Sequence, residues 1–188
     1  MATNSKKYHT TLANYFATQT LFFDGDKQNQ PNIRKCMEQP WQQIKAELWD
    51  DVTKTLCNLD FMQGKSVAKQ TYDLVADFNR VLEVLPENQE NIKMERKRQN
   101  RMEKYTQDLI ACAEGKISRF ALEAPESITF RTQEQIDTEI NRIKTNPKNL
   151  DKLNDFLNFI GNEADNFQKY ASDYAYFTHQ QAWNHAAE

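Results

Sequence analysis

Hydrophobic residues recur along most of the chain at the i, i+3 and i+4 spacing of a helix face, and this pattern predicts an all-α fold. Within residues 1–86 the periodic stretches are short, so we predict an N-terminal lobe of short helices stacked in antiparallel pairs. Residues 87–188 carry longer periodic stretches and predict a second lobe of longer amphipathic helices, packed as one unit. One short stretch, residues 116–131, resembles extended chain or a loop.

The first lobe contains two prolines that we expect to shape its helices. Pro31 is predicted in the first turn of a helix, where its missing N–H costs nothing. Pro40 should end that helix, because its ring clashes with the carbonyl four residues earlier. Two short helices are therefore predicted to meet at Gln39–Pro40, which gives Pro40 a structural role rather than a binding role.

Three buried stripes are predicted from helical spacing. The first helix should bury Leu12, Tyr15 and Phe16. The helix after Pro40 should bury Trp41, Ile44 and Leu48, and Trp49, one position beyond this stripe, should be partly exposed. A long amphipathic helix in the second lobe should bury one face made of Leu150, Leu153, Leu157, Ile160, Ala164 and Phe167.

The other boundaries of the second lobe follow from turn and capping residues. Pro86 should end the preceding amphipathic stretch, and one long helix is predicted from Glu90 to Gly115, where the glycine stops it. The sequence TQEQ, from Thr132 to Gln135, is a capping-box pattern that predicts a helix continuing to Lys144.

Composition excludes several classes of protein. The 188 residues carry a net charge of -3, which argues against a protein whose main task is to grip nucleic acid. No run of 18 apolar residues is present, so no membrane-spanning segment is predicted. The chain has 4 glycines, and neither a Walker A motif nor a Rossmann fingerprint can be written. Cys36, Cys57 and Cys112 are odd in number and far apart, which favours reduced thiols in a cytoplasmic protein.

Catalytic and metal-binding patterns are weak. His179 and His185 are six residues apart, which is not the spacing of a helical zinc pair, and His9 is distant in sequence. Asp50 and Asp51 are explained as acids in the first turn of a helix, where the helix dipole favours them. We therefore predict a protein that is not an enzyme, with no catalytic, cofactor-binding or metal-binding residues.

Two segments are candidate interaction sites. The basic run contains Lys93, Arg96, Lys97, Arg98, Arg101 and Lys104. It could be a solvated face or a surface for an acidic partner domain; nucleic acid is the alternative, although the run lacks the aromatic residues that stack on bases. The C-terminal segment is rich in aromatic residues, and Tyr174, Tyr176, Phe177 and Trp183 cannot all point inward from one helix, so we expect an interface there.

The order of several motifs resembles the helical connector between the NACHT or NB-ARC ATPase core and the WD-repeat propeller of STAND-type signalling NTPases. The first motif reads HTTLANYF and matches at His9, Leu12, Ala13, Tyr15 and Phe16. The second matches at Asn32, Arg34, Lys35, Glu38 and Pro40, and the third at Leu56, Phe61, Gly64 and Lys65. The closing QQAWN, Gln180 to Asn184, is similar to the segment that precedes the propeller in such proteins.

This resemblance implies a non-enzymatic module that transmits or braces contact between an ATPase core and a ligand-sensing propeller. Its partners would be those two domains of a larger chain, or a separate protein, with self-association through the C-terminal end as a further expectation. Neither the nucleotide-binding core nor the repeats are present in this sequence, so no ATP-binding residue carries over. The resemblance covers residues 9–83 and 180–184, and Glu87 to Lys148 have no counterpart in it.

Overall fold

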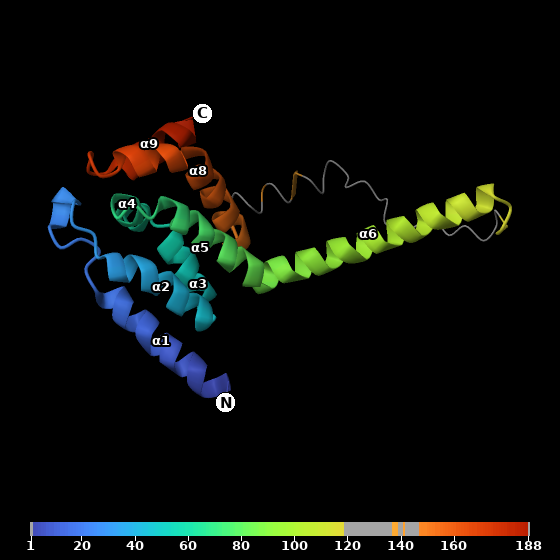
Figure 1. The fold of residues 1–188 in the computed structure, drawn as a ribbon, viewed down its shortest axis with the longest axis horizontal. Helices are drawn as coiled ribbons and strands as arrows, with labels where there is room; N and C mark the ends of the chain where they lie inside the picture. Colours follow the sequence, from blue (N-terminus) through green and yellow to red (C-terminus); the bar gives the residue numbers. More distant parts are fainter. Residues whose placement is uncertain (1, 119–136, 139–140, 142–146, 188) are drawn as a thin grey trace. The chain divides into compact units, whose positions relative to one another are not determined.

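The computed structural model describes residues 2–118, 137–138, 141 and 147–187, and divides the chain into two compact units (Figure 1). Unit 1 comprises residues 1–85 and 147–188, and unit 2 comprises residues 86–146. The all-α prediction is confirmed, because the described residues form helices and no sheet. Phe22 and Pro31 form an isolated antiparallel β-bridge within the loop after the first helix.

The helices of unit 1 are mostly short, as the sequence pattern predicts for its N-terminal part. Unit 2 is described chiefly by one long helix, α6 (Pro86–Ala113). The described helices of unit 1 are α1 (Ala2–Thr18), the 3-10 helix η1 (Gly25–Lys27), α2 (Ile33–Lys45), α3 (Trp49–Leu56), α4 (Leu59–Val67), α5 (Thr71–Val84), α8 (Asn149–Tyr170) and α9 (Phe177–Ala187).

The division into units differs from the predicted lobes of residues 1–86 and 87–188. The predicted boundary near residue 86 is a unit boundary, but residues 147–188 belong with the N-terminal helices. Helix α8 packs on α3, α4 and α5, and α9 packs on α4 and α8. Periodicity identifies the apolar face of a helix such as α8, but it does not say which distant helix covers that face.

The hydrophobic core of unit 1 lies where α4 and α5 meet α8. Helix α5 contributes Leu74, Phe78 and Val81, all fully buried. The predicted stripe of α8 is confirmed in its main members, since Leu153, Ile160, Ala164 and Phe167 are buried and Leu150 and Leu157 pack partly against the core. Full burial of each large apolar side chain contributes about 1.5–3 kcal/mol. These contacts hold α4, α5 and α8 together, and α9 packs on α4 and α8.

The prediction for Pro40 is wrong in one respect. Helix α2 runs without interruption from Ile33 to Lys45, with Pro40 inside it and buried. Proline removes one helical hydrogen bond and crowds the preceding turn, which disfavours it in a helix interior. Here packing of α2 against α1, α3, α4 and α5 holds the helix together across this position. The helix ends instead at Lys45, where Glu47 adopts a left-handed φ of 57°.

Pro31 lies just outside α2 rather than in its first turn. The N-cap of α2 is Asn32, whose side-chain oxygen accepts a hydrogen bond from the Lys35 N–H at 3.1 Å. An asparagine in this position satisfies one of the unpaired amides at a helix start. The backbone N–H of Asn32 donates to the Leu21 carbonyl at 2.7 Å, which ties the loop to the helix start.

The predicted burial of Trp41 is wrong, whereas Trp49 is partly exposed, as predicted. Trp41 is 42% exposed and points away from the core, with the Lys45 ammonium 4.5 Å from the centre of its ring. Trp49, the first residue of α3, packs partly buried against the core cluster. The predicted stripe placed Trp41, Ile44 and Leu48 on one helix, whereas α2 ends at Lys45 and Leu48 is the N-cap of α3.

Trp41→Ala should therefore change the free energy of unfolding by no more than about 1 kcal/mol, since substitutions at exposed positions rarely do more. Trp49→Ala should lower it by about 2–3 kcal/mol, somewhat less than a fully buried tryptophan. Urea unfolding of the two variants measures the difference. A larger loss for Trp41→Ala than for Trp49→Ala would contradict this placement.

Helix α1 also has a different buried face from the predicted one. Phe16 is buried as expected, but Leu12 and Tyr15 are exposed, and Ala13 is the second buried apolar residue of this helix. Helix α1 packs chiefly on α2 (Figure 1), so the strip that it buries is narrow. Apolar residues outside this strip remain in contact with solvent.

Helix α6 ends at the predicted glycine but begins before the predicted start at Glu90, since Pro86 was expected only to end the preceding stretch. Pro86 is its first residue, and Gly115, with a φ of 73°, lies just beyond its end. The Lys116 N–H donates to Ala111 and the Gly115 N–H donates to Cys112, which together form a Schellman motif. The predicted extended stretch from residue 119 onward, and the helix predicted from Thr132 to Lys144 apart from residues 137, 138 and 141, lie outside the described residues.

Candidate interaction surfaces

The C-terminal segment presents three aromatic side chains to solvent and buries a fourth. Tyr174 and Tyr176 lie in the turn between α8 and α9 and are exposed, and Trp183 on α9 is 79% exposed. Phe177 is 9% exposed and belongs to the core, with its ring 5.9 Å from that of Phe167. The predicted interface set is therefore corrected: Phe177 is a core residue that anchors the segment, and it is not part of an exposed surface.

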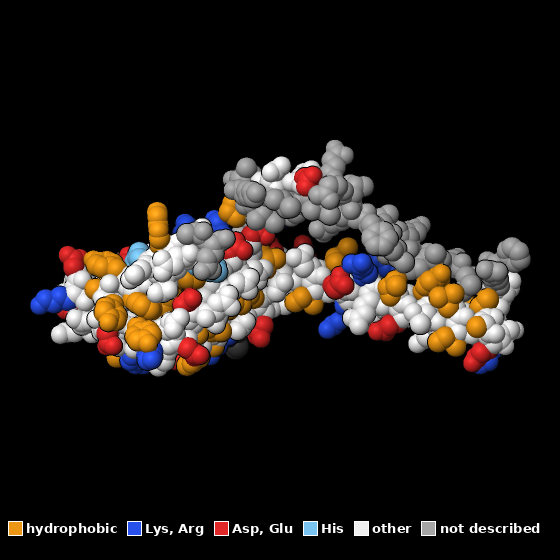
Figure 2. Space-filling view, turned by 90° about the horizontal axis from the view of Figure 1, so that it is seen from above, with side chains coloured by type: hydrophobic (Ala, Val, Ile, Leu, Met, Phe, Trp, Pro, Cys, Tyr) orange, Lys and Arg blue, Asp and Glu red, His pale blue; other side chains and the backbone are white. Residues whose placement is uncertain are grey.

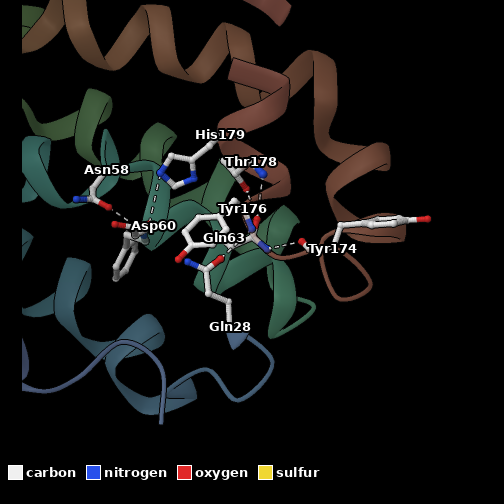
Figure 3. A network of polar contacts seen from close by, with 9 residues as sticks. Gln28, Asn58, Asp60, Gln63, Tyr174, Tyr176, Thr178 and His179 are labelled. Atoms are coloured by element: carbon white, nitrogen blue, oxygen red, sulfur yellow. Dashed lines mark hydrogen bonds and ion pairs between the residues drawn. The ribbon is translucent and has the colours of Figure 1, made fainter. Parts of the chain in front are cut away.

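The buried amide of Gln63 anchors this segment to α4 (Figure 3). Its nitrogen donates to the carbonyls of Ala171 and Tyr174 at 3.0 and 3.1 Å. Its oxygen accepts from the backbone N–H and the hydroxyl of Thr178 at 3.0 and 2.8 Å. All four bonds of the side chain are formed within a fully buried site, so the turn is held in one conformation. Sequence reasoning missed this residue. Its only signal was a single amide that follows Phe61 and Met62 in the stretch LDFMQG.

A second link holds the turn from the side of the N-terminal loop. Tyr176 and Gln28 both adopt left-handed backbone conformations, with φ of 60° and 54°. The Tyr176 N–H donates to the side-chain oxygen of the buried Gln28 at 2.9 Å (Figure 3). Left-handed conformations are costly for residues other than glycine, so this geometry persists because the surrounding contacts impose it.

The rings of the segment point in different directions. Tyr174 stacks on Phe177 with ring centres 6.4 Å apart, whereas Tyr176 contacts the ring of His179 at 5.7 Å. His179 in turn lies 3.4 Å from a carboxylate oxygen of Asp60 at the start of α4. The exposed aromatics therefore form separate contact points on a rigid turn, rather than one stacked cluster.

An apolar groove lies beside α9. It has a volume of about 350 Å³ and is lined by Leu59, Phe156, Phe159 and Ala182, with Asp155, Asn158 and His185 at its edge. Ala182 precedes Trp183 in sequence, so the groove and the most exposed aromatic side chain of this segment occur on one helix. Grooves with an apolar floor and polar edges are suited to receiving a side chain from a partner protein.

The predicted basic residues Lys93, Arg96, Lys97 and Arg101 are all exposed on α6. In Figure 2 the α6 part of the surface carries both Lys or Arg side chains and hydrophobic ones. Among the described residues, the one ion pair recorded within this run joins Arg98 to Glu95 at 3.8 Å. The structure thus places Lys93, Arg96, Lys97 and Arg101 on an accessible helix face, with no ion pair recorded for these four residues within the described part of the chain.

Cys36 and Cys57 have the properties of core thiols. Burial raises the pKa of Cys36 to about 11 and that of Cys57 to about 12. Both thiols are therefore protonated at neutral pH and are poor nucleophiles. Among the described residues, no group of three or more His, Cys, Asp or Glu side chains could hold a metal ion. In the same part of the chain, no helix has both the length and the apolar character required to cross a membrane.

Residues of the first two resemblance motifs contact one another. A ring nitrogen of His9 lies 2.7 Å from the side-chain oxygen of Gln42, whose amide donates to Glu38 at 2.9 Å. The ammonium of Lys35 donates to the carbonyls of Phe16, Ala17 and Gln19 at 2.7–3.2 Å. Burial lowers the pKa of Lys35. This lysine binds the free carbonyls at the C-terminal end of α1, so it joins α1 to α2.

The third motif forms the junction of α4 with its neighbours. A Cβ at Gly64 would lie 2.9 Å from Leu21 Cδ1, so glycine allows α4 to approach the N-terminal loop. Lys65 is fully buried, and its ammonium forms an ion pair with Asp77 of α5. The other carboxylate oxygen of Asp77 accepts from Arg80 at 2.7 Å. The motif residues thus maintain the packing of unit 1.

Comparison of the chain with protein-family models, with curated proteins and with solved structures gives no match. The class that the described residues define is an all-α helical domain, whose exposed aromatic turn is held by buried polar contacts.

Proposed function

We propose that this protein is a non-enzymatic helical interaction module that binds a protein partner through the C-terminal turn and α9. The observation that carries the proposal is the combination of exposed Tyr174, Tyr176 and Trp183 with a buried anchor at Gln63 and Phe177. Tyrosine and tryptophan are enriched among the residues that dominate binding energy. A backbone fixed before binding also reduces the entropy lost when the partner docks.

The resemblance to the STAND connector suggests the identity of the partner. In that arrangement the segment after QQAWN would lead into a WD-repeat propeller, and Trp183 within this motif would lie next to the first blade. The ATPase core would contact the module elsewhere. The proposal includes a cytoplasmic location, which is consistent with three cysteines kept as thiols.

Affinity capture with the immobilised chain, followed by mass spectrometry, tests the proposal. We expect recovery of a protein that contains a NACHT-type ATPase core or a WD-repeat propeller. Trp183→Ala should reduce this recovery by about 30-fold, the loss typical of a central contact residue. Its thermal stability should be unchanged, because the side chain is exposed.

Phe23→Ala provides the matched control, since Phe23 is an exposed aromatic residue in the N-terminal loop. It should retain full recovery of the partner. Equal recovery by wild type and Trp183→Ala would exclude the C-terminal segment as the binding surface.

The second candidate function is binding of nucleic acid through the basic run of α6. The observation that favours it is the exposure of Lys93, Arg96, Lys97 and Arg101 without ion-pair partners among the described residues. Such binding would weaken steeply with salt, because each phosphate contact releases a counterion. Gel-shift measurements across a salt series, with a variant that carries Gln at the four positions, distinguish this function from the first.

A further inference from the structure

Two apolar stripes face solvent on the first pair of helices of unit 1. On α1 the stripe consists of Tyr8, Leu12 and Tyr15, and on α2 it consists of Ile33, Met37 and Trp41. Each residue is more than two-fifths exposed, and each set follows the spacing of one helix face. The sequence analysis assigned Leu12, Tyr15 and Trp41 to the core, so these stripes became visible only in the structure.

The helices that carry the stripes are firmly held on their other faces. His9 contacts Gln42, Lys35 binds the end of α1, and Ala13 and Phe16 are buried. Figure 1 shows α1 and α2 running side by side, on the side of unit 1 away from α8 and α9. The stripes are therefore fixed features of a rigid helix pair, and they are separate from the C-terminal surface.

The charged groups around the stripes are mainly cationic. Helix α1 contains Lys6 and Lys7 and no acidic residue. On α2, Arg34 lies three and seven residues before Met37 and Trp41, and Lys45 rests over the Trp41 ring. Lys6 is paired with Glu47, whereas Glu38 accepts only from the neutral Gln42 amide and keeps its negative charge. Lys7, Arg34 and Lys45 have no recorded ion-pair partner in the described part of the chain.

We infer that the α1–α2 face binds an amphipathic helix whose apolar residues are flanked by Asp and Glu. Such a helix would place its apolar residues on the stripes and its carboxylates near Lys7, Arg34 and Lys45, as in other helix-binding surfaces. This inference goes beyond the proposed function, because it concerns another surface and another kind of partner.

A second copy of this chain fits the face less well. Two copies meeting through α1 and α2 would bring the same cationic residues together, and like charges across an interface are unfavourable.

Fluorescence anisotropy with labelled synthetic helices tests the inference on the full chain. The probe is a peptide of about 18 residues with Leu at i, i+3, i+4 and i+7 and Glu at the flanking positions. Its matched control has Lys in place of every Glu. We expect the Glu peptide to bind about tenfold or more tightly than the Lys peptide, with an affinity that falls as salt increases.

Variants locate the binding face. Met37→Ala/Trp41→Ala and, separately, Tyr8→Ala/Tyr15→Ala should each weaken binding of the Glu peptide about tenfold, whereas Asn14→Ala, on a different side of α1 from the stripe, should not. Arg34→Glu should weaken binding of the Glu peptide and strengthen that of the Lys peptide. Circular dichroism should confirm that every variant remains folded. Trp183→Ala should bind the Glu peptide normally, so failure of the proposed function leaves this test unaffected.

Three results would overturn the inference. The first is equal or tighter binding of the Lys peptide, and the second is no binding of the Glu peptide at any salt concentration. The third is a dimer in sedimentation experiments that Met37→Ala/Trp41→Ala converts to monomer, which would assign the face to a second copy of the chain.

Discussion

Asp77→Ala should lower the free energy of unfolding by about 3–5 kcal/mol, because removing one partner of a buried ion pair leaves an uncompensated charge. The ammonium of Lys65 has almost no solvent contact, and Asp77 is its ion-pair partner on α5. Urea unfolding followed by circular dichroism measures the change.

Replacing both charges separates the cost of an unpaired charge from the value of the pair. Lys65→Met/Asp77→Leu should recover most of the lost stability, since well-packed apolar residues often substitute for a buried pair with little loss. Arg80→Ala removes the other partner of Asp77, but its side chain is half exposed, so the expected loss is at most about 1 kcal/mol. A double variant as unstable as Asp77→Ala would show that the pair itself, and not the orphaned charge, stabilises unit 1.

Truncation after Ser172 should destabilise unit 1 by about 4 kcal/mol or more. If the aromatic residues formed only an interface, as the sequence predicts, this truncation would leave the remainder folded. The structure places Phe177 in the core and binds Thr178 to the buried Gln63. Loss of a buried phenylalanine costs about 3–5 kcal/mol. The unpaired amide of Gln63 adds about 1–3 kcal/mol.

Two variants divide this expected loss into its parts. Phe177→Ala should reproduce the loss of apolar contact, and Thr178→Val should reproduce part of the loss at Gln63 while keeping the chain intact. Deletion of residues 185–188 removes neither anchor and should have a much smaller effect. Thermal unfolding of all four proteins provides the comparison. An unchanged melting temperature after truncation at Ser172 would show that the residues after Ser172 do not stabilise unit 1.

Local residue chemistry was sufficient for the features that depend on neighbours in sequence. The period of the apolar residues identified the helices, and the buried face of α8 was predicted largely correctly, because a long helix shows its apolar side clearly. Gly115 after the end of α6 was predicted for the same kind of reason, because glycine adopts a left-handed conformation at low cost. Pro86 was predicted only to end the preceding stretch, whereas it also begins α6, where its missing N–H is not needed.

The sequence by itself therefore determined the all-α class, most of the helices and several of their boundaries. The tertiary structure decided the features that depend on distant contacts. Packing against four other helices accompanies the continuation of α2 through Pro40. The tertiary contacts also leave Trp41 exposed and place Trp49 partly against the core. The contact with Phe167 makes Phe177 a core anchor, and Gln63 binds the neighbouring Thr178. Helical spacing shows which residues share a face, but burial of that face depends on whether another helix covers it, and that helix can lie more than a hundred residues away in sequence, as α9 does from α4.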